Sequence, residues 1–243
     1  NGTRFQAIPV TKQATQAQAL VILENSDIYP GINAQTLPVR SYPSLEGELP
    51  VHVLGYVGGV SEADLSDPTK GFYRNENVGK SGLEYLYDDY LRGTPGIKTV
   101  IVDRKESVTR ISQLTHPVAG NNLVTNLNAA LQAATEKALA KAVKSSRSMG
   151  YRADSGAAIV LNVKTGGVLA MASYPTFDPN MFQKGLTVQQ AKDLFSESTG
   201  VPALSRAIQG TYAPASTFKA LSVVAATKAG YSMNSNYKCP SSV

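Results

Sequence analysis

The sequence has few of the residues that build metal centres and disulfide frameworks. It contains one cysteine and two histidines, His52 and His116, which stand far apart. One cysteine excludes an intrachain disulfide and a zinc site made of several cysteines, and two distant histidines leave little material for another metal centre. We therefore expect a protein that holds no metal.

Charge is also scarce. Charged residues make up 17% of the chain, and 23 Lys and Arg against 18 Asp and Glu give a net charge of +5. The basic residues form no run and do not alternate with aromatic residues, so we expect no nucleic-acid partner. No stretch approaches the roughly 18 consecutive apolar residues of a membrane-spanning helix. Because the chain begins at Asn1, without Met or a signal-like apolar segment, we expect a soluble piece of a longer protein.

What is present is enough for a folded core. The chain has 243 residues, of which 42% are hydrophobic, and its Gly and Pro content is ordinary. This composition excludes a disordered or collagen-like chain. With roughly 100–200 residues per domain, the length allows one large domain or two modest ones.

The first ninety or so residues predict short strands and loops. Residues 51–59 have a strand-like composition broken by glycines, and His52 is interpreted as a packed strand residue. Residues 61–80 are expected to form a loop, because they are rich in Asp, Lys, Gly and Asn.

A helix is expected after this loop. Ser81 would cap it, Glu84 would complete a capping box and Gly93 would end it. The adjacent Asp88 and Asp89 point in different directions on such a helix, so they are interpreted as a solvated face and not as an acid/base pair.

Later segments predict a mixture of strands and helices. Strands are expected near residues 98–103 and 107–114, and the turn at 117–120 marks our domain boundary. The other expected elements are a long helix capped by Asn128, a hairpin of residues 157–163 and 168–172, a short helix opened by Thr187 and Gln190, and an apolar helix over residues 217–229.

The segment before the last helix carries the most informative chemistry. Pro214 pre-sets the helix entry, so Ser216 falls in the first turn and Lys219 lies three residues further on the same face. A lysine can take the proton of a serine hydroxyl when burial or positive charge leaves part of it neutral, and a helix N-terminus favours the developing oxyanion. The Ser-x-x-Lys spacing alone also fits a non-catalytic alternative, in which a serine at the start of a helix stands near a surface lysine. A second Ser-x-x-Lys at residues 235–238 is interpreted as a chance match, because no helix follows it.

The context of Ser216 resembles a known family. Residues 212–219 resemble the Tyr-x-Pro-Gly-Ser-Thr-Phe-Lys motif of penicillin-binding proteins. Further segments are similar to class B members of that family over nearly the whole chain: residues 40–43 (Arg-Ser-Tyr-Pro), 52–58, 79–84, 91–93, 126–132, 169–175 and 177–180.

The resemblance has two departures and one gap. Ala215 stands where the family usually has Gly, and Asn128 where it usually has Asp. The family also needs Ser-x-Asn and Lys-Thr-Gly motifs after the nucleophile. Residues 164–166 (Lys-Thr-Gly) precede Ser216, and residues 232–234 (Ser-Met-Asn) follow it too closely, so both are interpreted as chance matches.

The resemblance implies an α+β fold in two parts. Residues 1–118 would form a mostly β pedestal, or dimerisation-type, domain. Residues 119–243 would form the N-terminal part of a transpeptidase domain, an antiparallel sheet flanked by helices that is incomplete at Val243.

The resemblance also implies a function. The chain would belong to a peptidoglycan D,D-transpeptidase, with Ser216 as nucleophile and Lys219 as base and with no cofactor. The Cys239-Pro240 ending favours the elongation type over the division type. Its partners would be D-Ala-D-Ala stem peptides, β-lactams and, through the pedestal, other cell-wall synthesis proteins. It would work at the outer face of the bacterial cell membrane, held there by an anchor absent from this chain. Alone, the chain is expected to be inactive or very weak.

Two alternatives remain open. One is another serine acyl enzyme, a D,D-carboxypeptidase or β-lactamase, against which the pedestal-like part argues. The other is a non-catalytic scaffold fragment of the cell-wall synthesis machinery, which would show no covalent chemistry.

Overall fold

The computed structural model describes residues 10–11, 14–35, 39–44, 46–74, 76–103, 108–234 and 236. The chain divides into two compact units, Asn1–Gln209 and Gly210–Val243.

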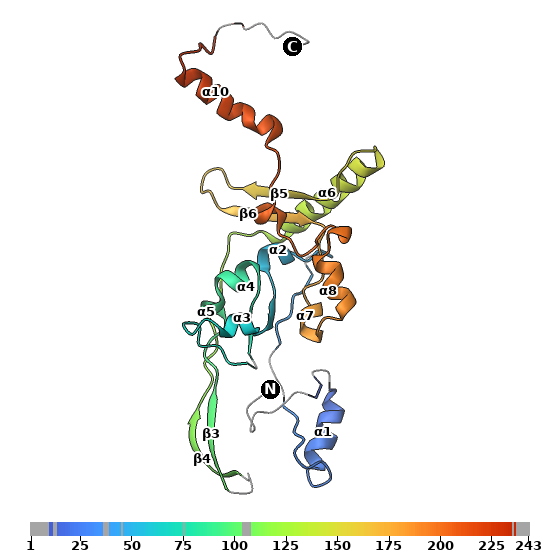
Figure 1. Cartoon of the computed structure of the whole chain (residues 1–243), viewed down its shortest axis with the longest axis vertical. Coiled ribbons are helices and arrows are strands. Elements are labelled where there is room, and N and C mark those ends of the chain that lie inside the picture. The colour runs from blue at the N-terminus through green and yellow to red at the C-terminus, as the bar shows by residue number, and fades with distance from the viewer. Residues whose placement is uncertain are drawn as a thin grey trace. The chain divides into compact units, whose positions relative to one another are not determined.

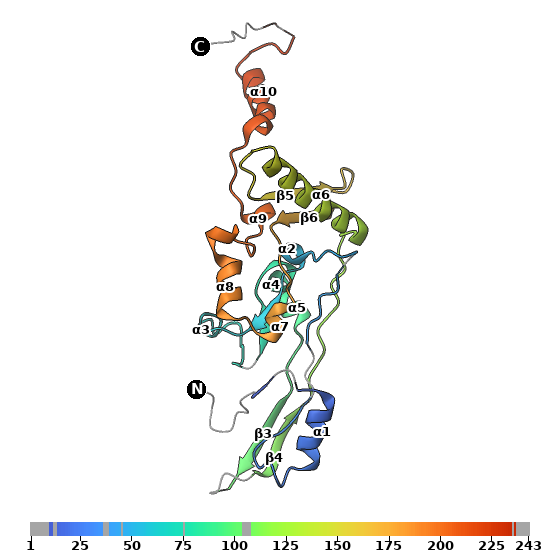
Figure 2. The ribbon, with the colours of Figure 1, turned by 90° about the vertical axis from the view of Figure 1, so that its right-hand side faces the viewer.

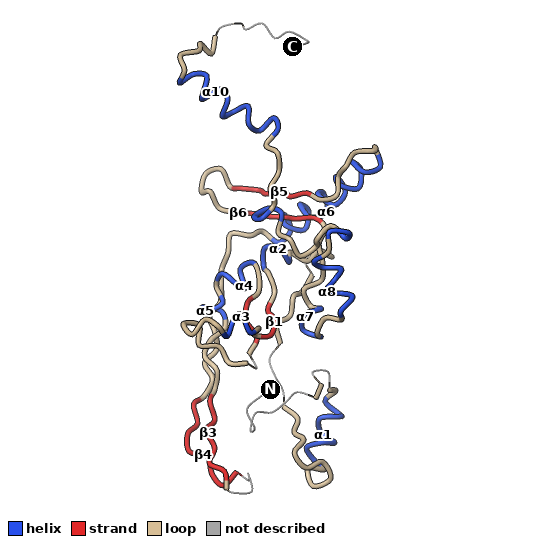
Figure 3. The backbone as a smooth tube through the Cα atoms, in the orientation of Figure 1, coloured by secondary structure: helices blue, strands red, loops and turns tan. Residues whose placement is uncertain are grey.

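The N-terminal half of the first unit alternates short helices with antiparallel ribbons (Figure 1). In chain order its elements are α1 (Gln16–Glu24), α2 (Val51–Leu54), β1 (Val57–Gly59), α3 (Glu62–Leu65), β2 (Asn77–Gly79), α4 (Gly82–Leu86), α5 (Asp88–Leu91), β3 (Ile97–Val102) and β4 (Val108–Thr115). β1 pairs with β2, and β3 pairs with β4, as two-stranded ribbons (Figure 3). The expected strands near 98–103 and 107–114 are therefore confirmed as β3 and β4.

The rest of the first unit is built on one ribbon and one long helix. Its elements are α6 (Ala129–Ser148), β5 (Gly156–Leu161), β6 (Val168–Tyr174), α7 (Met181–Lys184), α8 (Val188–Phe195), the 3₁₀ turn η1 (Glu197–Thr199) and α9 (Arg206–Gln209). α6 lies against the β5–β6 ribbon (Figures 1 and 2). The contact is made by small side chains, since Ala133, Ala170 and Ala172 are all fully buried.

Local sequence signals explain several of these elements. Asn128 caps α6 by accepting a hydrogen bond from the Leu131 N–H, and Thr187 and Gln190 form a complete capping box at α8. The predicted hairpin is β5 and β6, and Gly166 in its turn has φ +73°, which favours glycine. These predictions are confirmed.

The prediction of a single strand over residues 51–59 is wrong in its first half. Residues 51–54 form the helical turn α2 between Pro50 and Gly55, and only Val57–Gly59 is a strand. Val51, His52 and Val53 are buried in succession, which a strand with one wet face would not allow. His52 is packed as expected, but on a helix.

The segment 61–80 is also more ordered than the predicted loop. Ser61 and Asp64 form a capping box that opens α3, and residues 77–79 form β2. The acidic and polar residues that favoured a loop here act as helix-capping groups.

The expected capping box at Ser81 is absent from the structure. Ser81 precedes α4 but its side chain makes no capping bond, because Glu84 points to Arg40 instead. The guanidinium and carboxylate pair through Nε and Oε1 at 2.8 Å and through Nη2 and Oε2 at 3.0 Å. Such a forked, charge-assisted pair is stronger than a neutral capping bond.

The expected solvated pair of aspartates is split by the structure. Asp89 is exposed at 71% of its side-chain surface, whereas Asp88 keeps only 12% and contacts Arg92, with Nε and Oδ2 3.1 Å apart. Asp88 also accepts a hydrogen bond from the Gly79 N–H at 2.8 Å. The solvated-face interpretation is therefore wrong for Asp88, which joins β2 to α5.

Two glycines of the family-like segments stand where backbones meet. A Cβ atom at Gly55 would lie 1.7 Å from the Ser81 carbonyl oxygen, and one at Gly79 would lie 1.9 Å from that of Glu84. Only glycine fits at these two crossings.

The second unit holds the 3₁₀ turn η2 (Ala215–Thr217) and the helix α10 (Phe218–Lys228). This confirms the predicted apolar helix near residues 217–229. None of the helices in the described ranges is both long and apolar enough to cross a membrane. The predicted α+β class is confirmed, and the part expected to be mostly β also carries short helices.

Candidate active site

Ser216 and Lys219 lie where the chain enters α10. Ser216 is in the η2 turn, which begins at Pro214, and Lys219 is in the first turn of α10. The Thr217 N–H donates to the Pro214 carbonyl at 3.0 Å, and the Thr217 hydroxyl donates to the same oxygen. Pro214 therefore organises the turn that carries the serine.

Ala215, just before the serine, has a backbone that is unusual for its type. Its φ is +44°, in the left-handed region that costs a non-glycine residue about 1–2 kcal/mol. This is the position where the family motif usually has glycine. The turn thus keeps a glycine-like conformation although alanine stands there.

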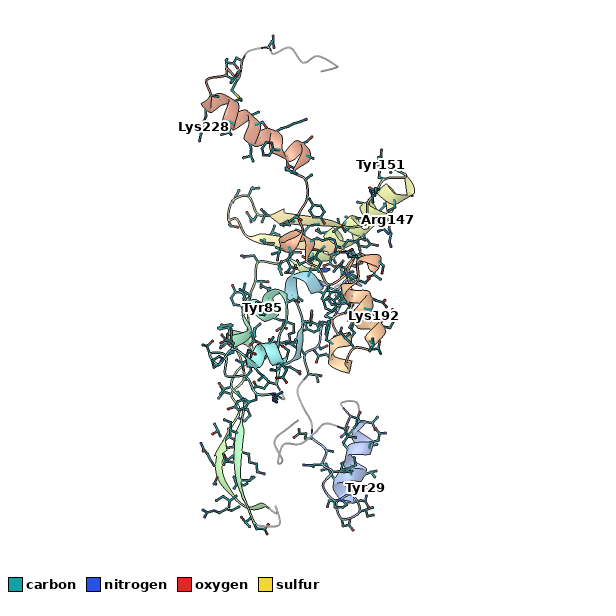
Figure 4. The ribbon with its side chains drawn as sticks, viewed as in Figure 1. Tyr29, Tyr85, Arg147, Tyr151, Lys192 and Lys228 are labelled. Atoms are coloured by element: carbon teal, nitrogen blue, oxygen red, sulfur yellow. The ribbon has the colours of Figure 1, made fainter. Side chains whose placement is uncertain are left out.

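The surroundings of the Ser216 and Lys219 pair are open. Both residues are exposed, and the described part of the chain shows no hydrogen bond between their side chains. α10 has no buried residue, and its apolar Phe218, Leu221 and Val224 are exposed. Figure 4 draws the side chains of this helix, with Lys228 labelled at its end. The described residues therefore do not supply the burial that base catalysis by a lysine requires.

The walls of two cavities in the described part of the chain do not include this pair. One, of about 430 Å³, runs along the second half of α10 and is lined by Val223, Tyr231 and Met233 among others. Another, of about 630 Å³, is lined by residues of α1 and its neighbours, including Val21 and Tyr29. Neither has Ser216 or Lys219 in its wall.

The chance matches lie in local turns. Asn162 accepts hydrogen bonds from the Lys164 and Thr165 N–H groups, which holds residues 164–166 in the hairpin turn. The Ser232 hydroxyl accepts from the Asn234 N–H at 3.2 Å. Of the Ser-x-x-Lys match at 235–238, Ser235 and Lys238 lie outside the described residues.

The structure joins two family-like segments that the domain prediction had separated. The Tyr42 N–H donates to Asn180 Oδ1, and Asn180 Nδ2 donates to the Tyr42 carbonyl, each at 3.0 Å. The Tyr42 hydroxyl accepts from the Val57 N–H at 2.9 Å. No local sequence signal could have paired residues 138 positions apart.

An aromatic cluster continues this junction. The rings of Tyr56 and Phe182 stack with centroids 3.7 Å apart, and Phe177 meets both rings at its edges. Phe177 also contacts His52 in a T-shaped arrangement at 5.8 Å. Tyr56 and His52 belong to the expected pedestal and the two phenylalanines to the expected transpeptidase part, so a packed interface joins them.

Comparison with known families agrees with this arrangement. The profile of the penicillin-binding protein dimerisation domain matches residues 1–125, and that of the penicillin-binding protein transpeptidase domain matches residues 156–243. The chain belongs to the penicillin-binding protein family. Its two matched domains, in this order, are those that the resemblance to class B members implied.

Curated relatives carry the same name in several bacteria. The Escherichia coli K12 protein "Peptidoglycan D,D-transpeptidase MrdA" is 34% identical over 232 residues, which cover 93% of this chain and 34% of that protein. The Acinetobacter baumannii protein of that name is 35% identical over 192 residues, which cover 79% of this chain and 26% of that protein. The chain thus spans about a third of the length of such relatives.

Solved structures of the family are similar as well. One, described as "Structural coordination of polymerization and crosslinking by a peptidoglycan synthase complex", is 38% identical with a TM-score of 0.60 and covers 76% of this chain and 32% of its own. Another, a complex between penicillin-binding protein PBP2 and MreC from Helicobacter pylori, is 27% identical with a TM-score of 0.56. The match covers 78% of this chain and 33% of that one.

Proposed function

We propose that this chain is part of a peptidoglycan D,D-transpeptidase that cross-links stem peptides through an acyl-serine intermediate. The observation that carries the proposal is the placement of Ser216 in the proline-initiated turn before α10, with Lys219 one turn later, inside the region matched by the transpeptidase profile. The names of the curated relatives support this activity over a carboxypeptidase or β-lactamase and over a non-catalytic scaffold.

In the acylation step, the Ser216 hydroxyl oxygen attacks the carbonyl carbon between the two D-alanines of a stem peptide. Neutral Lys219 takes the hydroxyl proton as the carbon–oxygen bond forms. The proton then passes to the leaving amine, the carbon–nitrogen bond breaks, and D-alanine departs. The backbone N–H groups at the start of α10 favour the developing oxyanion.

In the second step, an amine of a neighbouring stem attacks the ester carbonyl of the acyl-enzyme. A peptide bond forms, the ester bond breaks, and the proton lost by the amine returns to the Ser216 oxygen through the same base. A β-lactam enters the first step in the same way, because opening of its ring acylates the serine. This scheme uses no cofactor.

The finer assignments rest on the relatives. We infer an elongation-type role at the outer face of the bacterial cell membrane, because the curated relatives are named MrdA and one similar structure is a complex of PBP2 with MreC. We also infer that residues 1–118 form the pedestal, through which other cell-wall synthesis proteins bind, and that residues 119–243 belong to the transpeptidase domain. The dimerisation profile, which ends at residue 125, supports this division.

Covalent labelling tests the proposal. The 243-residue chain, and the same chain extended at Val243 with the C-terminal part of the E. coli relative, are incubated with penicillin and weighed by mass spectrometry. We expect the extended chain to gain one penicillin on Ser216 and the short chain to react slowly or not at all, because the described residues leave the site open. Ser216→Ala abolishes the adduct, whereas Ser222→Ala, in the following helix α10, keeps it.

Two results would contradict these expectations. An extended, folded chain that never acquires the adduct, or one that acquires it in Ser216→Ala, argues against the proposed function. Prompt labelling of the short chain at Ser216 argues against the expectation that it is inactive or very weak alone.

A further inference from the structure

The loop between α8 and α9 is held by two buried side chains from different parts of the chain. His52 on α2 is 8% exposed, and its Nε2 lies 2.7 Å from the Pro202 carbonyl oxygen. Arg206, the first residue of α9, is 7% exposed. Together they contact carbonyl groups throughout residues 200–204, which we call the 200–204 loop.

Arg206 is an unusual buried cation. Its Nη1 donates to the carbonyls of Val201 at 3.2 Å and Leu204 at 3.3 Å, and its Nη2 donates to that of Gly200. In the described residues the guanidinium meets carbonyl oxygens and no carboxylate. An arginine without a buried counter-ion is held by these dipoles alone, and it in turn fixes the loop that carries them.

The loop has a backbone that needs such support. Val201 has φ +42°, which is strained for a β-branched residue. Such a conformation persists only where surrounding bonds determine it. Arg206 and His52 together hold the carbonyl of Val201 itself and carbonyls before and after it, at residues 200, 202 and 204.

The His52 bond has a defined direction. A carbonyl cannot donate, so the ring must present an N–H at Nε2. Burial lowers the pKa of His52 and the charge of Arg206 adds to this, whereas the bond to Pro202 opposes it. The ring is therefore a neutral donor, oriented against the edge of Phe177.

The loop leads directly to α9, which is itself fixed to the sheet. The Ala207 N–H donates to the Ser173 hydroxyl on β6 at 3.1 Å. After α9 the chain runs through residues 210–215 to Ser216. The 200–204 loop and α9 thus form the end of the first unit.

We propose that His52 and Arg206 are positioning residues, which tie the 200–204 loop and α9 to helix α2 and so fix the end of the first unit, from which the chain continues to Ser216. The part that concerns Ser216 rests on the proposed acyl-transfer function. The tie itself does not, because it lies wholly within the first unit.

Hydrogen exchange in the 243-residue chain tests the tie. The readouts are the protected amides of the loop and α9, namely Ala203, Leu204, Ile208 and Gln209, whose N–H groups all bond to backbone carbonyls. His52→Phe keeps an aromatic ring beside Phe177 but removes the donor, and His52→Gln keeps a donor but removes the ring. We expect exchange at these amides to become about tenfold faster in His52→Phe and to stay near the original rate in His52→Gln.

Two further variants sharpen the test. Arg206→Met keeps the length of the side chain without its donors and is expected to speed exchange at the same amides. Tyr42→Phe is the matched control, because it removes a hydroxyl that accepts from the Val57 N–H and that does not contact the 200–204 loop. It should affect amides near Val57 and not those of α9.

The second arm measures penicillin acylation in the extended chain. Loss of positioning predicts that His52→Phe lowers the limiting acylation rate constant while the half-saturating penicillin concentration stays the same, and that His52→Gln restores the rate. If His52→Phe acted only by destabilising the protein, it would lower the fraction of chains that react with penicillin, and Tyr42→Phe would lower that fraction to the same extent.

The proposal is overturned if His52→Phe leaves the α9 amides protected, or if His52→Gln exposes them as much as His52→Phe does. Faster exchange with an unchanged acylation rate overturns the part of the proposal that concerns Ser216. An unmodified chain that never acylates counts against the proposed function instead, while hydrogen exchange still decides the tie.

Discussion

The side-chain amide of Gln132 binds both backbone groups of Met171. Its Nε2 donates to the Met171 carbonyl at 2.9 Å, and its Oε1 accepts from the Met171 N–H at 2.8 Å. Gln132 is 2% exposed, and the nearby Asn128 N–H adds a bond to the Leu169 carbonyl at 2.9 Å. The start of α6 therefore covers the edge of β6 that does not face β5, in the place of a further strand.

Gln132→Leu should destabilise the protein strongly. Leucine has a similar volume but leaves the Met171 N–H and carbonyl buried without partners, which costs about 2–4 kcal/mol for the two groups. Urea unfolding measures the loss. Gln189→Leu is the control, because Gln189 is exposed on α8 and its side chain donates to Asp193 one turn away, so its replacement should change stability by less than about 0.5 kcal/mol. Equal losses in both variants would show that the amide at β6 has no special role.

Glu136→Gln should make the free energy of unfolding less sensitive to a rise in pH. Burial raises the pKa of Glu136 and Glu48 adds to this, while the bond from Gln132 opposes it. The folded protein holds this proton more tightly than the unfolded chain, so the carboxyl group's contribution is full at low pH and is lost as the pH rises through the raised pKa.

The variant keeps an acceptor for Gln132 but cannot ionise. We expect its free energy of unfolding to exceed that of the original protein at about pH 8 and to equal it at about pH 4, as measured by urea unfolding at each pH. The exposed Glu24→Gln should show no such difference. A Glu136→Gln advantage that is the same at both pH values would contradict the assignment.

A double-mutant cycle should find real coupling between Arg40 and Glu84. The carboxylate side of this forked pair is 11% exposed, so desolvation strengthens the interaction. We expect a coupling free energy of about 1–2 kcal/mol from Arg40→Met, Glu84→Gln and the double variant, measured by denaturant unfolding. The exposed pair of Arg74 and Glu62 provides the comparison, and its coupling should be much smaller. Equal coupling in the two pairs would refute the role of burial.

Replacement of Ala215 should separate conformation from side-chain bulk. Ala215→Gly relieves the left-handed strain and is expected to keep or raise the acylation rate of the extended chain. Ala215→Val adds a β-branch to that conformation and should slow acylation about tenfold, equivalent to about 1.4 kcal/mol. Ala225→Val is the control, because Ala225 is an exposed residue in the second half of α10, and it should leave the acylation rate nearly unchanged. Fast acylation in Ala215→Val would show that the turn does not need this backbone.

The features that the sequence predicted correctly are those decided within a few residues. The cap of α6 at Asn128, the capping box of α8 and the hairpin with Gly166 in its turn each depend on groups at most about four positions apart or on one backbone angle. The placement of Ser216 and Lys219 at the start of α10 is equally local, whereas their catalytic roles stay a prediction.

The predictions that failed had distant competitors. Glu84 is suited to a capping box but finds Arg40, which lies 44 positions away in the sequence, and Asp88 finds the Gly79 N–H and Arg92. Residues 51–54 have strand-like composition, but Val51, His52 and Val53 are buried in succession, so tertiary packing overrides their local preference.

The sequence by itself thus determined the family, the likeness to a two-part transpeptidase and the local helix and hairpin signals. Only the tertiary structure decided that Asn180 binds the backbone of Tyr42 and that His52 binds the carbonyl of Pro202, across 138 and 150 positions. The physical reason is that each of these bonds ends on a backbone group. Every residue carries a carbonyl, so no side-chain pattern can show which of them a distant residue will reach.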